Sequence, residues 1–368
     1  MTIGATTGDH GYDRATAVKE FDESKIGVKG LVDSGATTIP PFFIHPPETL
    51  TNSTPSTRST APPASDLIPV VDLTGVDSDR RSRIVEQIRY ASKEFGFFHV
   101  INHGVPSDVI NRTIEAIRAF NEQPTEVKSQ HYTREMGRGV SFSTNFDLFK
   151  SKAASWRDTI QMRLGPVPPD FEHIPEIFRR EVLEWDQHVR RVGEVLMEIL
   201  SEGLGVTPER LKELSCLEGR LMAAHYYPFC PQPDLTLGIT PHTDPGVLTM
   251  LLQNHIGGLQ VKYGDEWLEA KPVPDALVIN IGDILQMISN DEYKSVEHRV
   301  LANPHRESRI SIAIFLNPGK REDLYGPLPE LTSPEKPALF QHFTLIECMK
   351  RFFTKELDGK SMVNFFRL

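Results

Sequence analysis

Residues 247–282, VLTMLLQNHIGGLQVKYGDEWLEAKPVPDALVINIG, contain four short runs rich in aliphatic and β-branched residues. The runs are VLTMLLQ, GLQVKY, EWLEAK and ALVINIG, and turn-forming residues such as Gly264 and Asp265 separate them. Runs of about four to eight residues with this composition, bounded by turn residues, are typical of β-strands. The stretch therefore predicts consecutive strands joined by short connections.

Similar runs continue on both sides of this stretch. RLMAAHYY (220–227) precedes it, and SVEHRVL (295–301) and RISIAIFL (309–316) follow it. Parallel strands would need crossover connections of about a dozen residues or more, usually helices, and no segment between these runs has helical periodicity. We therefore expect an antiparallel double-stranded β-helix, the jelly roll of cupin-like proteins.

The first half of the chain has helical periodicity instead. Apolar residues recur at intervals of three and four over 84–95 and, as one long stripe, over 175–203. The predicted class is mixed α/β (α+β), with the long helix supporting the jelly roll from outside and the folded body beginning at the strand 67–73. The expected division is an N-terminal extension with a Ser/Thr/Pro-rich linker (1–66), a helical region with a few strands (67–215), the jelly roll (216–340) and a C-terminal part (341–368) with a helix at 343–357.

The composition argues against several classes of function. Forty basic and fifty acidic residues give a net charge of -10 without a long basic run, so no nucleic-acid partner is expected. No apolar stretch approaches the roughly 18 residues of a membrane span, and no signal peptide is recognisable. Three scattered cysteines, Cys216, Cys230 and Cys348, fit buried thiols in a reducing compartment. We expect a monomeric, cytosolic protein that binds a small molecule.

A His-x-Asp motif, His242-Thr243-Asp244, lies in a proline-rich segment of the predicted jelly roll. Residues two apart on an extended chain project to one side, so His242 and Asp244 can share a metal ion. His298 lies in another predicted strand of the same jelly roll. Two imidazoles and one carboxylate form the facial triad of non-haem Fe(II) oxygenases, whereas zinc more often takes Cys or a third His. The three residues therefore predict an iron site.

Arg309 and Ser311 lie two residues apart on the predicted strand 309–316, so both side chains point toward the face that His298 uses. A charged Arg in an otherwise apolar strand is costly to bury unless an anion pairs with it, and a carboxylate suits a guanidinium. A keto-acid that binds iron at one end and Arg309 at the other would bring the local charge to zero. Tyr227 can add a hydroxyl to the same carboxylate, in which case Tyr226 faces the opposite side.

Three stretches together resemble a known family. They are YYPFCPQPDLTLGITPHTDPG (226–246), LQMISNDEYKSVEHRV (285–300) and RISIAIFLNP (309–318). They are similar to the plant iron- and 2-oxoglutarate-dependent dioxygenases, and the similarity extends from IPVVDLTG (68–75) to the C-terminal helix. The segment FDESKIGVKGLVDSGATTIPPFFIHP (21–46) resembles the branch named 1-aminocyclopropane-1-carboxylate oxidase homologues.

The resemblance implies a jelly roll whose substrate pocket is roofed by the N-terminal region, with Phe315 beside the iron. We add Phe142 and Phe146 as candidates for the pocket wall. Many relatives carry Asn where this chain has His225, and Pro where it has Phe229. The implied iron ligands are His242, Asp244 and His298, and the implied 2-oxoglutarate contacts are Arg309, Ser311 and Tyr227.

The implied reaction is oxidation, most often hydroxylation, at a C–H bond of a small specialised plant metabolite. 2-Oxoglutarate and dioxygen would be converted to succinate and carbon dioxide. A second hypothesis is an iron-dependent oxidase of the 1-aminocyclopropane-1-carboxylate oxidase type that uses ascorbate as reductant, with Arg309 binding the substrate's own carboxylate. A third is a binding protein that retains the residues of the site without turnover.

Overall fold

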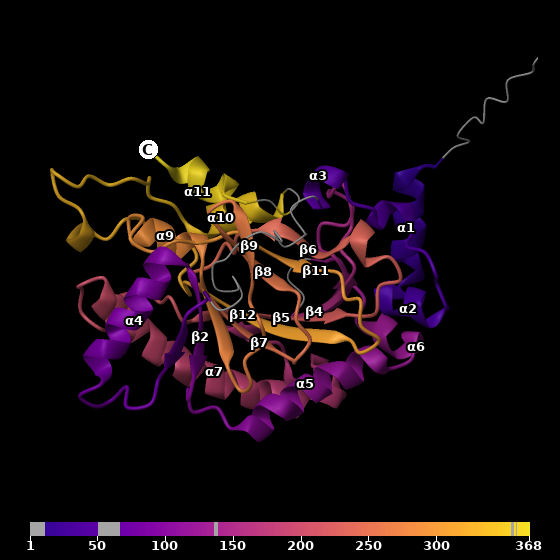
Figure 1. Ribbon diagram of the computed structural model, residues 1–368, viewed down its shortest axis with the longest axis horizontal. Helices are drawn as coiled ribbons and strands as arrows, with labels where there is room; N and C mark the ends of the chain where they lie inside the picture. The colour runs from indigo at the N-terminus through magenta and orange to yellow at the C-terminus, as the bar shows by residue number, and fades with distance from the viewer. Residues whose placement is uncertain (1–11, 51–66, 136–138, 355–356, 358) are drawn as a thin grey trace, which may run out of the picture.

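The computed structural model describes residues 12–50, 67–135, 139–354, 357 and 359–368 (Figure 1). Its strands form two sheets that share a hydrophobic cluster, to which Phe97 and Val278 of the larger sheet and Leu259 and Val261 of the smaller one contribute. The order in the larger sheet is β1 (Val70–Asp72), β2 (Phe97–Ile101), β10 (Leu277–Ile281), β7 (Leu248–Gln253), β12 (Arg309–Asn317), β5 (Gly219–Tyr227), β4 (Asp158–Gly165), β3 (Val140–Thr144). The smaller sheet has the order β6 (Leu237–His242), β11 (His298–Leu301), β8 (Leu259–Tyr263), β9 (Glu266–Glu269).

The pairing confirms the predicted jelly roll. β1 and β2 pair in parallel, and the other described strand pairs are antiparallel. The larger sheet takes β1 to β4 from the region before residue 216, where we expected helices with a few strands. The short helix α9 (Asp283–Ile288) also interrupts a region where none was expected.

Strand β12 shows how the sequence orients the larger sheet. Its isoleucines, among them Ile310 and Ile312, are fully buried in the main hydrophobic cluster on the helix side. Arg309, at an alternating position, points to the opposite side, toward the smaller sheet. On the neighbouring β5, Tyr226 packs in the helix-side cluster and Tyr227 in the cluster between the sheets. A slip of one residue would exchange these two faces, so the aliphatic positions fix the register.

Helices α4 (Arg81–Glu94), α5 (Ser107–Glu122) and α7 (Glu176–Gly203) pack against the helix side of the larger sheet, and α5 and α7 lie together along one side of the molecule (Figure 1). The periodic stripe predicted over 175–203 is buried in α7 as expected. No helix in the described ranges is both long and apolar enough to cross a membrane. The remaining helices are α1 (Arg14–Ser24), α2 (Gly27–Asp33), α3 (Pro47–Leu50), α6 (Thr125–Lys128), α8 (Arg210–Glu213), α10 (Leu345–Phe353) and α11 (Ser361–Phe366), with 3-10 turns η1 (Pro41–Phe43), η3 (Ser129–His131), η4 (Phe171–His173), η5 (Pro233–Leu235) and η6 (Pro329–Leu331).

Two expectations about the chain ends were wrong. The single helix expected at 343–357 is replaced by α10, which ends at Phe353, and by α11, which begins at Ser361. The folded body also begins before the strand at 67–73, because α1, α2 and η1 pack on the rest of the protein. The Ser/Thr/Pro-rich stretch 51–66 lies outside the described residues.

The N-terminal segment is held by both apolar and polar contacts. Phe43 of η1 meets Trp156 edge to face, with ring centroids 5.0 Å apart. The buried carboxylate of Asp158 accepts hydrogen bonds from the first backbone N–H groups of α2, those of Val28 and Lys29, at 2.8 Å each. Farther along, the ring Nε2 of His45 lies 3.1 Å from the carbonyl oxygen of Ala154 and donates to it. The segment is thus attached at several points to strand β4 and the loop before it.

We predict that this attachment weakens in acid because of His45. Burial lowers the pKa of His45 to about 4 from its ordinary 6.5. The unfolded chain therefore takes up a proton near pH 6.5 while the folded protein resists it, so the contribution of His45 is complete above pH 6.5 and is lost as pH falls toward 4. The loss can reach about 3 kcal/mol.

The measurement is chemical denaturation of the wild type and of His45→Leu between pH 7.5 and pH 4. The stability difference between the two proteins should shift in favour of the variant as the pH falls, since only the wild type carries this titrating ring. A difference that stays constant over the range would contradict the prediction.

Candidate active site

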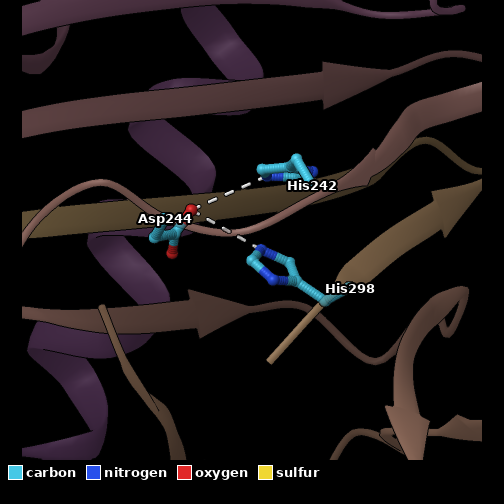
Figure 2. Close-up of side chains that lie close together, drawn as sticks. All are labelled: His242, Asp244 and His298. Atoms are coloured by element: carbon cyan, nitrogen blue, oxygen red, sulfur yellow. Dashed lines mark ion pairs between the residues drawn. The ribbon is translucent and has the colours of Figure 1, made fainter. Parts of the chain in front are cut away.

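Three side chains of the His-x-Asp motif and strand β11 converge between the two sheets (Figure 2). His242 is the last residue of β6 and His298 the first of β11, and the two are direct partners in the antiparallel pair. Their ring centroids lie 4.2 Å apart, and each Nε2 lies 3.6 Å from Oδ1 of Asp244. All three residues are buried. The pairing of β6 with β11 therefore brings His298 next to His242, although the two residues are far apart in the sequence.

Hydrogen bonds select one tautomer for both rings. Nδ1 of His242 lies 2.8 Å from the carbonyl oxygen of Thr240, and Nδ1 of His298 lies 3.3 Å from that of Val296. A carbonyl can only accept, so each ring carries its proton on Nδ1 and keeps the Nε2 lone pair free. These are the two nitrogens that face Asp244. A ligand imidazole is usually oriented in this way by its second nitrogen.

The carboxylate of Asp244 is oriented by two residues of the larger sheet. Its Oδ2 accepts hydrogen bonds from Thr249 Oγ1 at 2.5 Å and from Asn280 Nδ2 at 2.8 Å. Oδ1 is left to face the two histidines. The sequence analysis missed both donors, although Asn280 could have been noticed as the polar residue of the apolar run ALVINIG. One oxygen is thus fixed by the protein and the other is available to a metal.

The protonation states suit metal binding. Burial and the neighbouring His298 lower the pKa of His242 to about 3, against the opposing effect of Asp244, so the ring is neutral. Burial alone would raise the pKa of Asp244, but the two histidines and the hydrogen bonds of its carboxylate lower it overall. The group offers two imidazole nitrogens and one carboxylate oxygen within 4.8 Å of one another. This donor set fits an Fe(II) ion with open coordination positions.

Arg309 is fully buried farther along the interior of the same jelly roll. Its Nη1 donates to Ser311 Oγ at 3.1 Å, its Nη2 donates to Gln253 Oε1 at 2.8 Å, and its guanidinium lies 4.8 Å from the ring of Tyr227. Nε has no hydrogen-bond partner, and none of the described carboxylates pairs with the guanidinium. Burial lowers the pKa of Arg309. A buried cation with polar neighbours and no counter-ion is suited to an anionic ligand.

Gln253 is a further member of this group that the sequence analysis did not identify. It ends the predicted strand VLTMLLQ and lies directly opposite Ser311 in the β7–β12 pair. Its Nε2 is buried without a partner, as is the hydroxyl of Tyr227. Unpaired buried donors are costly, so both atoms could bond to an anion placed beside Arg309.

The two departures from the family pattern have different surroundings. His225 lies on β5 opposite Ser311, and its Nδ1 is 3.0 Å from Oγ1 of Thr159. Burial holds the pKa of His225 well below its ordinary value, so this ring is neutral. Phe229 lies outside this interior, where the guanidinium of Arg306 stacks on its ring at 4.6 Å.

The three phenylalanines proposed for the substrate pocket lie in different places. Phe315 is half-buried on the inward face of β12, opposite Thr249, the residue that binds Asp244. Phe146 packs against Phe352 and Phe353 of α10, with centroids 5.9 and 5.5 Å away.

Phe142 was assigned to the wrong face. It is fully buried on the helix side of β3, with its ring centroid 5.5 Å from that of Phe120 on α5. It belongs to the hydrophobic core that joins the sheet to the helices. The alternation of the strand turns its neighbours, Ser141 and Ser143, toward the other face instead.

Comparison with known proteins agrees with this geometry. The sequence profile of the 2OG-Fe(II) oxygenase superfamily matches residues 218–318, and that of the non-haem dioxygenase N-terminal region, named for morphine synthesis, matches residues 68–178. 1-Aminocyclopropane-1-carboxylate oxidase homolog 1 of Arabidopsis thaliana is 47% identical over 354 residues, 95% of each chain. The chain belongs to the 2OG-Fe(II) oxygenase superfamily. A tomato homolog of the same name is 40% identical over 98% of both chains.

Solved structures place this oxygenase in the same fold. JOX2, solved in complex with 2OG, Fe and JA, has a TM-score of 0.80 and 32% identity, covering 93% of this chain and 97% of that one. The rice dioxygenase for auxin oxidation has a TM-score of 0.70 at 22% identity, over 82% of this chain and all of that one, which shows the shared fold. The protein is therefore a 2-oxoglutarate-dependent oxidoreductase whose cofactors are Fe(II) and 2-oxoglutarate.

We predict that Asn280→Leu weakens divalent-metal binding without unfolding the oxygenase. The substitution removes one of the two donors to Asp244 Oδ2, so the carboxylate loses its fixed orientation. Loss of such a supporting contact typically costs about 10-fold or more in affinity. Binding can be followed by the visible absorption of Co(II). Asn121→Leu, at a buried asparagine of α5 remote from the site, is the matched control. Equal affinities of Asn280→Leu and the wild type would refute the role.

Proposed function

We propose that this enzyme oxidises a C–H bond of a small specialised plant metabolite, and we assign roles to its buried polar residues. The observation that carries the assignment is a buried guanidinium without a carboxylate partner, in the same interior as the group of His242, Asp244 and His298. The proposed iron ligands are His242, Asp244 and His298, and the proposed contacts of the distal carboxylate of 2-oxoglutarate are Arg309, Ser311, Tyr227 and Gln253.

The balance of charge supports this assignment. Fe(II) brings two positive charges, which Asp244 reduces to one, and Arg309 adds another. A dicarboxylate brings two negative charges, so the occupied site is neutral. Charges in a low-dielectric interior are stable only when they are compensated nearby. A ligand with a single carboxylate would leave this interior positive.

Bound iron and 2-oxoglutarate would supply the oxidising power: the keto-acid loses carbon dioxide and takes up one atom of dioxygen to become succinate, and the other oxygen atom serves to oxidise the substrate. The chain's own residues hold and orient these reactants. The carbonyls of Thr240 and Val296 keep Nε2 of both histidines turned inward, and Gln253 and Ser311 hold the guanidinium of Arg309 in one orientation. The half-buried ring of Phe315 adjoins the metal centre on the substrate side, and Phe146 is the remaining candidate for the pocket wall.

The class of substrate and the type of C–H oxidation are part of what we propose. The names of the Arabidopsis and tomato relatives leave an oxidase of the 1-aminocyclopropane-1-carboxylate oxidase type as the alternative. That enzyme would use ascorbate and would not form succinate. That the protein is monomeric and cytosolic, and that it has no nucleic-acid partner, stays a prediction.

The first test needs no substrate. Anaerobic apo-protein is titrated with Fe(II) and then with 2-oxoglutarate, and the weak visible band of the iron-bound keto-acid is recorded. We expect the band in the wild type and its loss in His298→Ala. In Arg309→Ala we expect a dissociation constant for 2-oxoglutarate at least about 30-fold higher, because one partner of a buried charge pair is gone. Iron binding without a band would favour the ascorbate-type oxidase, and absence of iron binding would refute the metal site.

A second prediction concerns Gln253. The nearly isosteric Gln253→Glu would place a carboxylate 2.8 Å from Nη2 of Arg309. This internal counter-ion would compete with 2-oxoglutarate, so we expect cosubstrate affinity to fall by about 100-fold or more while Fe(II) affinity changes little.

The matched control for this variant is Gln260→Glu. Gln260 Oε1 accepts a hydrogen bond from Arg299 Nε at 2.9 Å, so the same substitution beside another buried arginine tests for a general effect of the new charge. We expect the control to bind 2-oxoglutarate as the wild type does. Unchanged 2-oxoglutarate binding in Gln253→Glu would remove Gln253 from the site.

A further inference from the structure

The residues between the last two helices contact both segments that carry the proposed ligands. The carbonyl oxygen of Gly359 accepts a hydrogen bond from Thr243 Oγ1 at 2.9 Å. Nζ of the next residue, Lys360, donates to the carbonyl oxygen of Ser295, three residues before His298. We call residues 359–360 the C-terminal clip. It lies beside the His-x-Asp motif on one side and the start of β11 on the other.

Thr243 links the clip to the motif itself. It is the buried residue between His242 and Asp244, and its side chain points away from the two ligands, as alternation requires. Its Oγ1 also lies 3.1 Å from Oδ2 of Asp283 at the start of α9. The backbone N–H of Asp283 donates to the carbonyl oxygen of Asp244 at 2.8 Å. The motif is therefore held from behind by α9 and by the clip.

Lys360 links the clip to the segment that leads into β11. Its Nζ donates to Oε1 of Gln286 at 2.9 Å, and the same oxygen accepts the backbone N–H of Ser295 at 2.9 Å. Gly359 packs so closely on Glu297, the residue before His298, that a side chain at this position would collide with its carboxylate. The clip is anchored by α11, whose Met362, Val363 and Phe366 are buried in the main core.

The sheet alone holds the two segments together unevenly. His242 and His298 are paired directly, but the register between β6 and β11 shifts immediately after His298. An irregular ladder resists displacement of its strands less well than a continuous one. The clip ties the same two segments on the side away from the metal.

We propose that the C-terminal clip is a positioning element of the metal centre, in which Thr243 and Lys360 keep the His-x-Asp motif and the His298 segment at the separation that one metal ion requires. The proposal rests on the ligand assignment made above. It predicts that changes in the clip alter the rate at which the metal is released. The proposed contacts of 2-oxoglutarate lie elsewhere in the interior, so the clip does not act through them.

The test compares Thr243→Val and Lys360→Met with the wild type. Each protein is loaded with Co(II), and the rate at which a chelator removes the metal is measured by visible absorption. We expect metal release about 10-fold faster in each variant, in line with other supporting contacts of metal ligands. Thr243→Ser, which keeps the hydroxyl, should release the metal at nearly the wild-type rate. In the double variant the rate of metal release should rise by less than the product of the two single increases, since both residues act through one segment.

Two matched controls separate this role from a general loss of packing. Thr113→Val removes a buried hydroxyl that bonds the carbonyl of Val109, and Lys128→Met removes a buried ammonium that bonds the carbonyl of Asn121. Both sites are remote from the metal centre. The controls should release Co(II) at the wild-type rate even if their apo-proteins melt at lower temperature. The melting temperature of each apo-protein is measured in parallel, so that an unfolded variant is recognised.

The outcomes distinguish this proposal from the function on which it rests. If the wild type binds neither Co(II) nor Fe(II), the ligand assignment fails. If the wild type binds metal and both folded clip variants release it at the wild-type rate, the clip proposal fails and the ligand assignment stands. Should Thr243→Val not fold, Lys360→Met decides the question, because its side chain contacts no ligand residue.

Discussion

A metal ion in this protein would be shared by two sheets, and the rest of the structure depends on that arrangement. The two histidines belong to the smaller sheet, whereas the second oxygen of Asp244 is held by Thr249 and Asn280 of the larger one. The donor atoms can meet only if the sheets keep a fixed spacing. Side chains such as Phe97, whose ring lies edge to face 5.1 Å from that of His298, fill the gap and set this spacing.

The larger sheet serves two purposes because its two faces differ. On the helix side, aliphatic residues pack against α5 and α7 in a dense core, which resists changes in volume. On the inner side, Arg309 is retained at a cost that an apolar residue would avoid. The stability gained on one face of β12 therefore allows an uncompensated charge on the other. Alternation along a strand makes this division possible within a few residues.

The parts of the fold that depend on local pattern could be predicted from the sequence. The stripe of α7, the strands of the jelly roll and the convergence of His242 with Asp244 follow from periodicities of about 3.6 and 2 residues. The prediction for Phe142 was wrong because its strand, β3, was not recognised. Without the β3–β4 register, the face on which a residue lies is undetermined. Gln253 was visible as the polar end of a strand, but its position opposite Ser311 is a long-range property. The contacts of Phe43 with Trp156 and of Gly359 with Thr243 join segments more distant in sequence, which no local signal encodes.

A second buried arginine shows why burial alone does not identify a candidate ligand site. Arg157 lies immediately before β4, and its Nη1 donates to the carbonyl oxygen of Gly238 at 3.0 Å, which ties the start of β4 to β6. Burial lowers its pKa, and Tyr227 and the carboxylates of Asp147 and Asp158 act in the opposite direction. For Arg309 the opposing contribution comes from Tyr227 alone, without a carboxylate. Two carboxylates of the protein thus act on the charge of Arg157, whereas none of the described carboxylates does so for Arg309, and this difference favours Arg309 over Arg157 as the place for an anionic ligand.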